Sequence, residues 1–113
     1  KNILNKEILF DVIIEDASHS HKDQIISLFL LFKILKKKGI FIIEELDFPD
    51  TRKDMNLENE RPTLREILNN ISNKKDFSSK FIDKKHKEYF LNNYSSINIF
   101  KGNFNEVAII TKK

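Results

Sequence analysis

The stretch that decides the fold is LFDVIIEDASHSHKDQIISLFLLFKILKKKGIFIIEEL, residues 9–46. It opens with the β-branched run Val12-Ile13-Ile14 and repeats that pattern in residues 40–43. An apolar run without alternation is typical of a parallel strand that is buried on both faces. Between the two runs, apolar residues recur at helical spacing. The stretch therefore predicts a strand, a crossover helix and a second strand parallel to the first.

The ends of the crossover helix are predicted from capping residues. Ser20, followed three residues later by Asp23, predicts the start of the helix, and His21 is expected on the surface of its first turn. Gly39 is the expected C-cap. The run Lys36-Lys37-Lys38 is then expected in the last helical turn, rather than in a phosphate-binding patch. Cations there interact favourably with the negative end of the helix dipole.

Two further helices are expected. Thr63 and Glu66 have the spacing of a capping box, and the apolar stripe that follows predicts an amphipathic helix over residues 64–72. Asp83 is the expected N-cap of a helix over residues 83–92.

The chain closes with a predicted hairpin. Residues 95–100 and 106–112 have strand character, and Gly102-Asn103 supply turn chemistry between them. Residues 47–60 are polar and predict a long loop. The order of elements predicts an α/β fold with a three-layer sheet, mostly parallel with an antiparallel C-terminal hairpin, and residues 1–113 as a single domain.

Composition argues against several classes of partner. The chain has 113 residues, with 20 Lys and Arg against 17 Asp and Glu, a net charge of +3 that is too small to predict a nucleic-acid-binding protein. Cysteine is absent, so disulfides and thiolate metal sites are absent too. No signal peptide or membrane-spanning segment is recognisable. We therefore expect a cytoplasmic protein that binds neither nucleic acid nor membrane.

Acidic residues follow both predicted parallel strands. Glu15-Asp16 end the first strand and Glu44-Glu45 end the second. The carboxyl ends of neighbouring parallel strands share one edge of a sheet, and clustered carboxylates are ligands for Mg²⁺. His19 lies three residues beyond Asp16, where a histidine has the chemistry of a general base. Acids at strand ends also occur as solvated loop starts, so the residues alone leave both interpretations open.

The same residues resemble a known family. FDVIIEDASH (residues 10–19) and LKKKGIFIIEEL (residues 35–46) resemble the second half of class I S-adenosylmethionine-dependent methyltransferases, and in particular the metal-dependent sugar O-methyltransferases of macrolide biosynthesis, of the mycinamicin and macrocin type. In that family one strand ends in Asp-Asp-Gly-Ser-His and the next, after Leu-Lys-Pro-Gly-Gly, ends in Glu-Asp-Leu. The resemblance implies a Rossmann-like fold, of which this chain holds the second half.

The resemblance also implies roles for individual residues. Asp16, Glu44 and Glu45 match metal ligands, which implies Mg²⁺ or a similar divalent cation. His19 matches the proposed general base. The implied reaction is methyl transfer from S-adenosylmethionine to a hydroxyl of a sugar or natural-product acceptor. Glu45 stands where the family has Asp, and Ala17 where it has Gly, which alters the geometry that the site requires.

The cofactor-binding half of the family pattern has no counterpart here. The chain has two glycines, Gly39 and Gly102, and neither opens a helix after a strand. No cofactor-binding residue is therefore assigned, and these residues alone are expected not to bind S-adenosylmethionine. The unalternated apolar pattern of the first strand predicts a central strand with a neighbour on each side. We therefore expect an N-terminal half of the domain, or a second copy, to cover the open edge of the sheet.

Two other classes remain open. The first is a metal-independent methyltransferase or a hydroxylase-like relative with the same acids. The second is a non-catalytic α/β interaction module. Most phenylalanines are expected in the core, and Phe48, Phe77 and Phe81 have no assigned role in a pocket.

Overall fold

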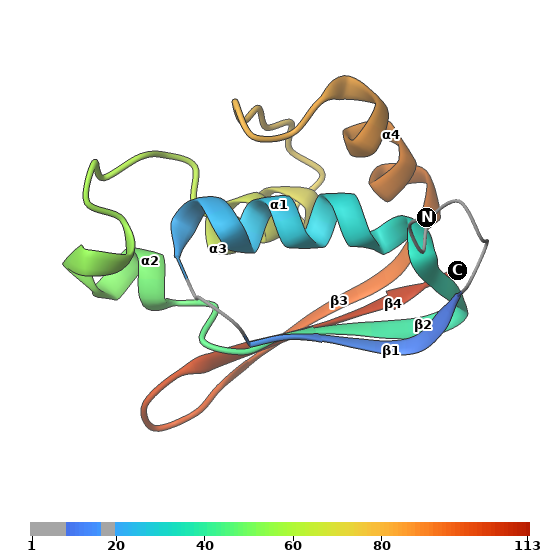
Figure 1. Cartoon of the computed structure of the whole chain (residues 1–113), viewed down its shortest axis with the longest axis horizontal. Helices are drawn as coiled ribbons and strands as arrows, with labels where there is room; N and C mark the ends of the chain where they lie inside the picture. The colour runs from blue at the N-terminus through green and yellow to red at the C-terminus, as the bar shows by residue number, and fades with distance from the viewer. Residues whose placement is uncertain (1–8, 17–19) are drawn as a thin grey trace, which may run out of the picture.

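The structure is a computed structural model that describes residues 9–16 and 20–113 (Figure 1). His19, the predicted general base, lies outside the described residues. The elements in chain order are β1 (Phe10–Glu15), α1 (His21–Leu31), the 3₁₀ turn η2 (Phe32–Ile34), β2 (Leu35–Ile43), α2 (Phe48–Thr51), the 3₁₀ turn η3 (Lys53–Met55), α3 (Leu64–Ser72), α4 (Lys84–Asn93), β3 (Tyr94–Lys101) and β4 (Glu106–Lys112).

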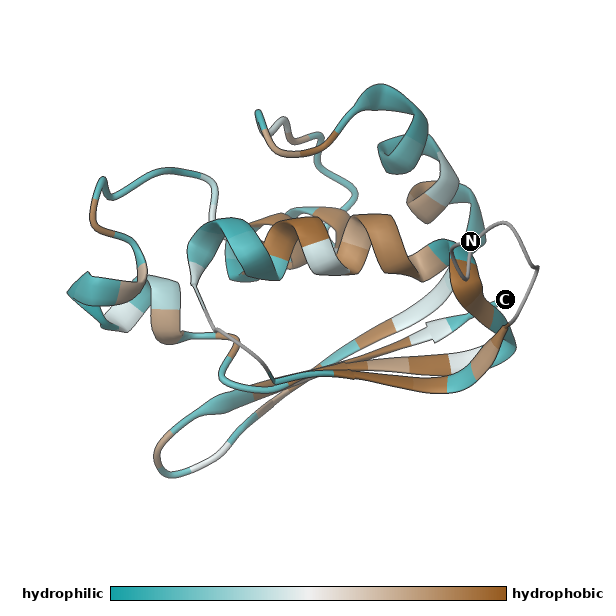
Figure 2. Cartoon of the chain, in the orientation of Figure 1, coloured by the Kyte–Doolittle hydropathy of each residue, from teal (hydrophilic) through white to brown (hydrophobic). Residues whose placement is uncertain are grey.

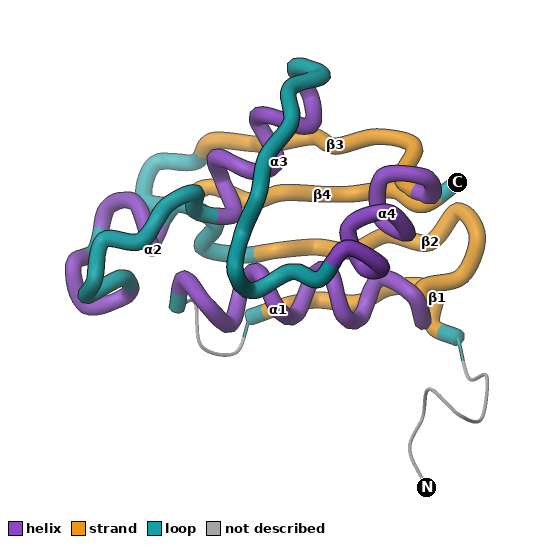
Figure 3. The backbone as a smooth tube through the Cα atoms, turned by 90° about the horizontal axis from the view of Figure 1, so that it is seen from above, coloured by secondary structure: helices purple, strands orange, loops and turns teal. Residues whose placement is uncertain are grey.

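The strands form one sheet in the order β1-β2-β4-β3 (Figure 3). β1 and β2 are parallel neighbours, with Val12 opposite Ile40 and Ile14 opposite Ile42, which confirms the prediction for this pair. β4 runs antiparallel to both β2 and β3. The prediction of a mostly parallel sheet is wrong for the described residues, because the returning strand of the hairpin lies inside the sheet and contributes two antiparallel pairings to one parallel pairing.

The helices α1, α3 and α4 all cover the same face of the sheet (Figures 1 and 3). The core lies between this face and the helices, and Phe90 of α4 is at its centre. Its ring lies 4.9 Å from that of Phe29, 4.7 Å from that of Phe32 and 5.5 Å from that of Tyr94, between ring centroids. Aromatic contacts of this kind therefore join α4 to α1 and to the first residue of β3.

The opposite face of the sheet carries apolar side chains that no described element covers. Val12 is 47% exposed, Ile14 56% and Phe100 56%. The partners of these residues in neighbouring strands continue the apolar face, which we call the open face, through Ile40, Ile42, Val107 and Ile109. Figure 2 shows the apolar colouring along β1 and β2. The described residues thus form two layers, with helices on one face of the apolar strands only, and the three-layer prediction is not confirmed by them.

The transition from α1 to β2 differs from the prediction. α1 ends at Leu31, and β2 begins at Leu35, so Lys36-Lys37-Lys38 are exposed strand residues rather than a helical turn. Gly39 is not a helix C-cap but lies within β2, where a Cβ atom would stand 2.8 Å from the carbonyl oxygen of Asp11. Glycine is therefore required by the close approach of β1.

Several local predictions are confirmed. Thr63 and Glu66 form a complete capping box at the start of α3, the side chain of Asp83 accepts a hydrogen bond at the start of α4, and that of Ser20 accepts one at the start of α1. The predicted loop over residues 47–60 contains α2 and η3. Among the described residues, no helix has the length and apolar character needed to cross a membrane.

Candidate functional site at the carboxyl ends of the parallel strands

The two parallel strands end side by side, as predicted. The backbone N–H of Glu44 donates a hydrogen bond to the carbonyl oxygen of Glu15 at 3.2 Å, directly where β1 and β2 stop. Both acidic pairs therefore lie at one edge of the sheet, at the end where α1 begins and α2 lies (Figure 1).

The acids at this edge differ in their surroundings. Glu15 is buried on the helix-covered face, Asp16 is exposed, and Glu44 and Glu45 are half-buried. Glu45 adopts a left-handed backbone conformation with φ of 56°. Such a conformation costs free energy for a residue with a side chain, so the turn after β2 is held by its surroundings.

The first turn of α1 supports this turn directly. The side-chain amide of Gln24 donates to the carbonyl oxygen of Glu45 at 2.9 Å, and Gln24 is almost completely buried. The backbone N–H of Phe48 donates to the same carbonyl at 3.2 Å. The start of α1 is therefore connected by a hydrogen bond to the turn that follows β2.

The predicted metal ligands lie at the same edge but do not form a ready-made ligand set. Within residues 9–16 and 20–113, no group of three or more His, Cys, Asp or Glu side chains is arranged to hold a metal ion. The role of Asp16, Glu44 and Glu45 as metal ligands therefore remains a prediction.

His21 was expected on the surface, and that expectation is wrong. Only 4% of His21 is exposed, and its ring meets that of Phe81 edge-on, with centroids 5.6 Å apart. Its Nε2 lies 3.9 Å from Oε1 of Glu60, and its Nδ1 is buried without a hydrogen-bond partner among the described residues. The sequence did carry a signal for this burial, because His21 precedes the core residue Ile25 by one helical turn.

The surroundings of His21 favour the neutral imidazole. Burial lowers the pKa of His21 below its ordinary value, and this effect exceeds the opposing influence of Glu60 and Asp50. A neutral imidazole offers one N–H donor and one acceptor nitrogen. The Nδ1 atom itself is buried, so it is not open to a ligand in the neighbouring cavity.

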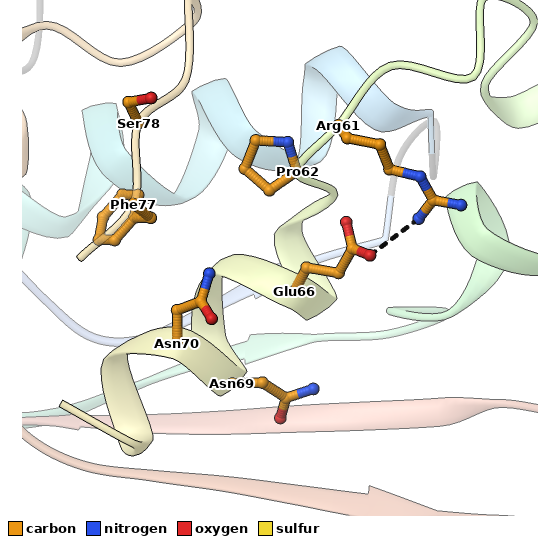
Figure 4. A pocket seen from close by; sticks show the side chains of 7 residues that line it. All are labelled: Arg61, Pro62, Glu66, Asn69, Asn70, Phe77 and Ser78. Atoms are coloured by element: carbon orange, nitrogen blue, oxygen red, sulfur yellow. Dashed lines mark hydrogen bonds and ion pairs between the residues drawn. The ribbon is translucent and has the colours of Figure 1, made fainter. Parts of the chain in front are cut away.

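A cavity of about 280 Å³ lies beside His21, lined also by Glu60, Arg61, Lys80 and Phe81. A second cavity of about 510 Å³ shares Arg61 and Ser78 with it and extends along α3 to Asn69, Asn70 and Phe77 (Figure 4). The two hollows together form a polar groove, which we call the His21 groove. Phe77 and Phe81, which had no assigned role, provide its aromatic surface.

Opposite charges in the His21 groove are paired. Glu60 forms an ion pair with Lys80, whose hydrogen bond lowers the pKa of the Glu60 carboxyl. Arg61 lies 3.2 Å from Oδ1 of Asp50. It also lies 3.1 Å from Oε2 of Glu66, the contact drawn in Figure 4. Because the charges are balanced, the groove suits a neutral polar ligand better than a strongly charged one.

Comparison with known proteins shows a likeness in fold. No family model matches the chain, and no curated protein matches it. Among solved structures, the chain is similar to MycE methyltransferase from the mycinamycin biosynthetic pathway, solved in complex with Mg and SAH. The identity is 21% and the TM-score 0.57, and the match covers 91% of this chain and 27% of that chain. The chain therefore has the fold of part of a methyltransferase and spans about a quarter of the length of the protein it matches.

Proposed function

We propose that this chain forms part of an S-adenosylmethionine-dependent O-methyltransferase that acts on a hydroxyl of a sugar or other small-molecule acceptor. One observation carries the proposal: parallel strands β1 and β2 bring two pairs of acids to one edge, within a fold similar to that of MycE methyltransferase. Ligands of open α/β sheets bind beyond the carboxyl ends of the strands.

A divalent cation is the second part of the proposal. Asp16, Glu44 and Glu45 would hold it, since carboxylate oxygens suit a hard cation and the three residues lie at one edge of the sheet. Their side chains are not gathered into a ligand set among the described residues. When bound, such an ion acts as a Lewis acid that lowers the pKa of a coordinated hydroxyl.

The His21 groove is proposed to receive the body of the acceptor. Its carboxylates accept hydrogen bonds from hydroxyl groups, Arg61 and Lys80 donate them, and the ring of Phe81 offers an apolar face. The hydrogen bond from Gln24 to Glu45 connects α1, which carries His21, to the acidic edge.

The general base is proposed to be His19, on the resemblance of DASH (residues 16–19) to the family motif. In this role His19 would take the proton of the acceptor hydroxyl, and S-adenosylmethionine, when bound, would supply the methyl group to that oxygen and leave as S-adenosylhomocysteine.

The experiment is a methyl-transfer assay with labelled S-adenosylmethionine and acceptors that carry neighbouring hydroxyls, using the whole protein that contains these residues. Asp16→Asn is expected to reduce transfer by about 100-fold or more, because loss of a ligand should cost at least as much as loss of its supporting residues. Glu88→Gln, an exposed substitution on α4, is the control. Equal activity of the two variants contradicts the role of Asp16, and full activity in excess chelator identifies a metal-independent transferase instead.

The open face is proposed to be covered by further polypeptide of the same domain. The exposed side chains of Val12, Ile14 and Phe100 form an apolar surface that is costly to leave in water. Among the described strands, β1 is the outermost on its side of the sheet, and its outer edge is where a further strand would pair. Sedimentation of residues 1–113 tests this proposal. If the chain stays monomeric at high concentration, the open face does not need to be covered by further polypeptide. If it forms a defined dimer, a second copy of the chain covers the open face.

A further inference from the structure

Another pocket, separate from the His21 groove, lies at the opposite end of the sheet from the acidic edge. Its volume is about 440 Å³, and it is bounded by η2, the first residues of β2, the last turn of α4 and the end of β4. Four of its lining residues are lysines, and none of its lining side chains is a carboxylate. We call it the lysine pocket, and its lysines are Lys33, Lys37, Lys112 and Lys113.

Lys112 is the buried member of this set, with 7% of its surface exposed. Its ammonium group donates to the carbonyl oxygens of Leu35 at 2.7 Å and Phe32 at 3.2 Å. It also lies over the rings of Tyr89 and Phe32, at 4.9 Å and 5.6 Å from their centroids. A lysine ammonium has three N–H donors, and the two carbonyls use two of them. The third donor has no oxygen partner among the described residues, and the ammonium group is a fixed, buried positive charge of a residue that lines the pocket.

The other three lysines are exposed and add positive charge around Lys112. None of the four forms an ion pair with a carboxylate in the described part of the chain, whereas the neighbouring Lys36 lies 3.6 Å from Oδ1 of Asp11. Like charges that share one concave site repel one another unless an anion neutralises them. The contrast with the His21 groove is clear, since every cation there has an acidic partner.

We propose that the lysine pocket binds a small molecule that carries a diphosphate or triphosphate group. Several positive charges favour a multivalent anion over a monovalent one. Lysine binds phosphate as a compact point charge, and a bounded pocket of this volume suits a small molecule. The net charge of +3 is small for a chain that binds a polynucleotide, which favours a small anion as the ligand. This site is independent of the proposed methyl transfer.

The test is calorimetric titration of the 113-residue chain with inorganic pyrophosphate at low ionic strength, followed by amide NMR shifts. Lys33→Gln/Lys37→Gln removes two exposed cations without touching Lys112, and Lys74→Gln/Lys75→Gln removes two exposed lysines elsewhere. The first variant is expected to weaken pyrophosphate binding about tenfold, and the control by less than about twofold. Shifted amides are expected to cluster around Tyr89, Asn93 and Lys112.

Four results would overturn the proposal. The first is equal loss of affinity in both double variants, and the second is a shift pattern spread over lysines throughout the chain. The third is equal or tighter binding of citrate, which would show that the pocket does not select phosphate. The fourth is binding of a single-stranded oligonucleotide with no binding of pyrophosphate, which would identify a nucleic-acid surface instead. Conversely, saturable pyrophosphate binding that the first double variant alone weakens supports the site.

Discussion

Replacing Lys112 by Met is expected to destabilise the chain substantially. Met keeps most of the apolar stem over Phe32 and Tyr89 but removes the donors to the carbonyls of Phe32 and Leu35. Hydrogen bonds from a charged donor contribute about 1.5–3 kcal/mol each, and relief of the buried charge offsets part of this, so the expected loss is about 2–3 kcal/mol. For a domain of this length, that corresponds to a fall in Tm of about 8–12 °C.

The assay is urea unfolding followed by circular dichroism, with Lys113→Met as the matched control. Lys113 is exposed, and its substitution is expected to change the free energy of unfolding by less than about 0.5 kcal/mol. The midpoint for Lys112→Met should fall while the slope stays constant. Equal stability of the two variants would show that the carbonyl contacts contribute nothing measurable. Greater stability of Lys112→Met would show that repulsion among the pocket lysines outweighs those contacts.

Three further outcomes are expected. Thr63→Ala should lower the free energy of unfolding, measured by chemical denaturation, by about 1–2 kcal/mol, because it removes the cap of α3 and the hydrogen bond to Asp50. A decrease of less than about 0.3 kcal/mol contradicts the capping role. Since burial lowers the folded-state pKa of His21, the folded state binds fewer protons, so the His21 contribution to stability is complete above the unfolded pKa of about 6.5 and is lost as pH falls below it. His21→Phe should make the free energy of unfolding less dependent on pH between about pH 5 and 7 than it is in the native chain. An unchanged pH dependence shows that His21 is not the group responsible. Val12→Lys/Ile14→Lys should weaken any self-association measured by sedimentation, because it places charge on the open face.

The sequence by itself determined the local elements. The spacing of apolar residues and the caps at Ser20, Thr63 and Asp83 are signals within a few residues of one another, and the structure confirms the helices they predict. The parallel pairing of β1 with β2 was also predictable, because a short strand–helix–strand unit has essentially one way to return to the sheet. The adjacency of the acidic pairs follows from that pairing.

The tertiary structure decided what depends on residues distant in sequence. α1 ends before the lysine run because Leu35 pairs with β1, while Lys112, 77 residues away, binds the carbonyl of Leu35. His21 is buried because Phe81 and Glu60, from two separate loops, close over it. From its position on an apolar stripe, a histidine can be either buried or exposed. The packing of those two loops over His21 decides that it is buried. Likewise, an unalternated apolar strand shows that both its faces avoid water, but which face the helices cover is decided by how the whole chain packs.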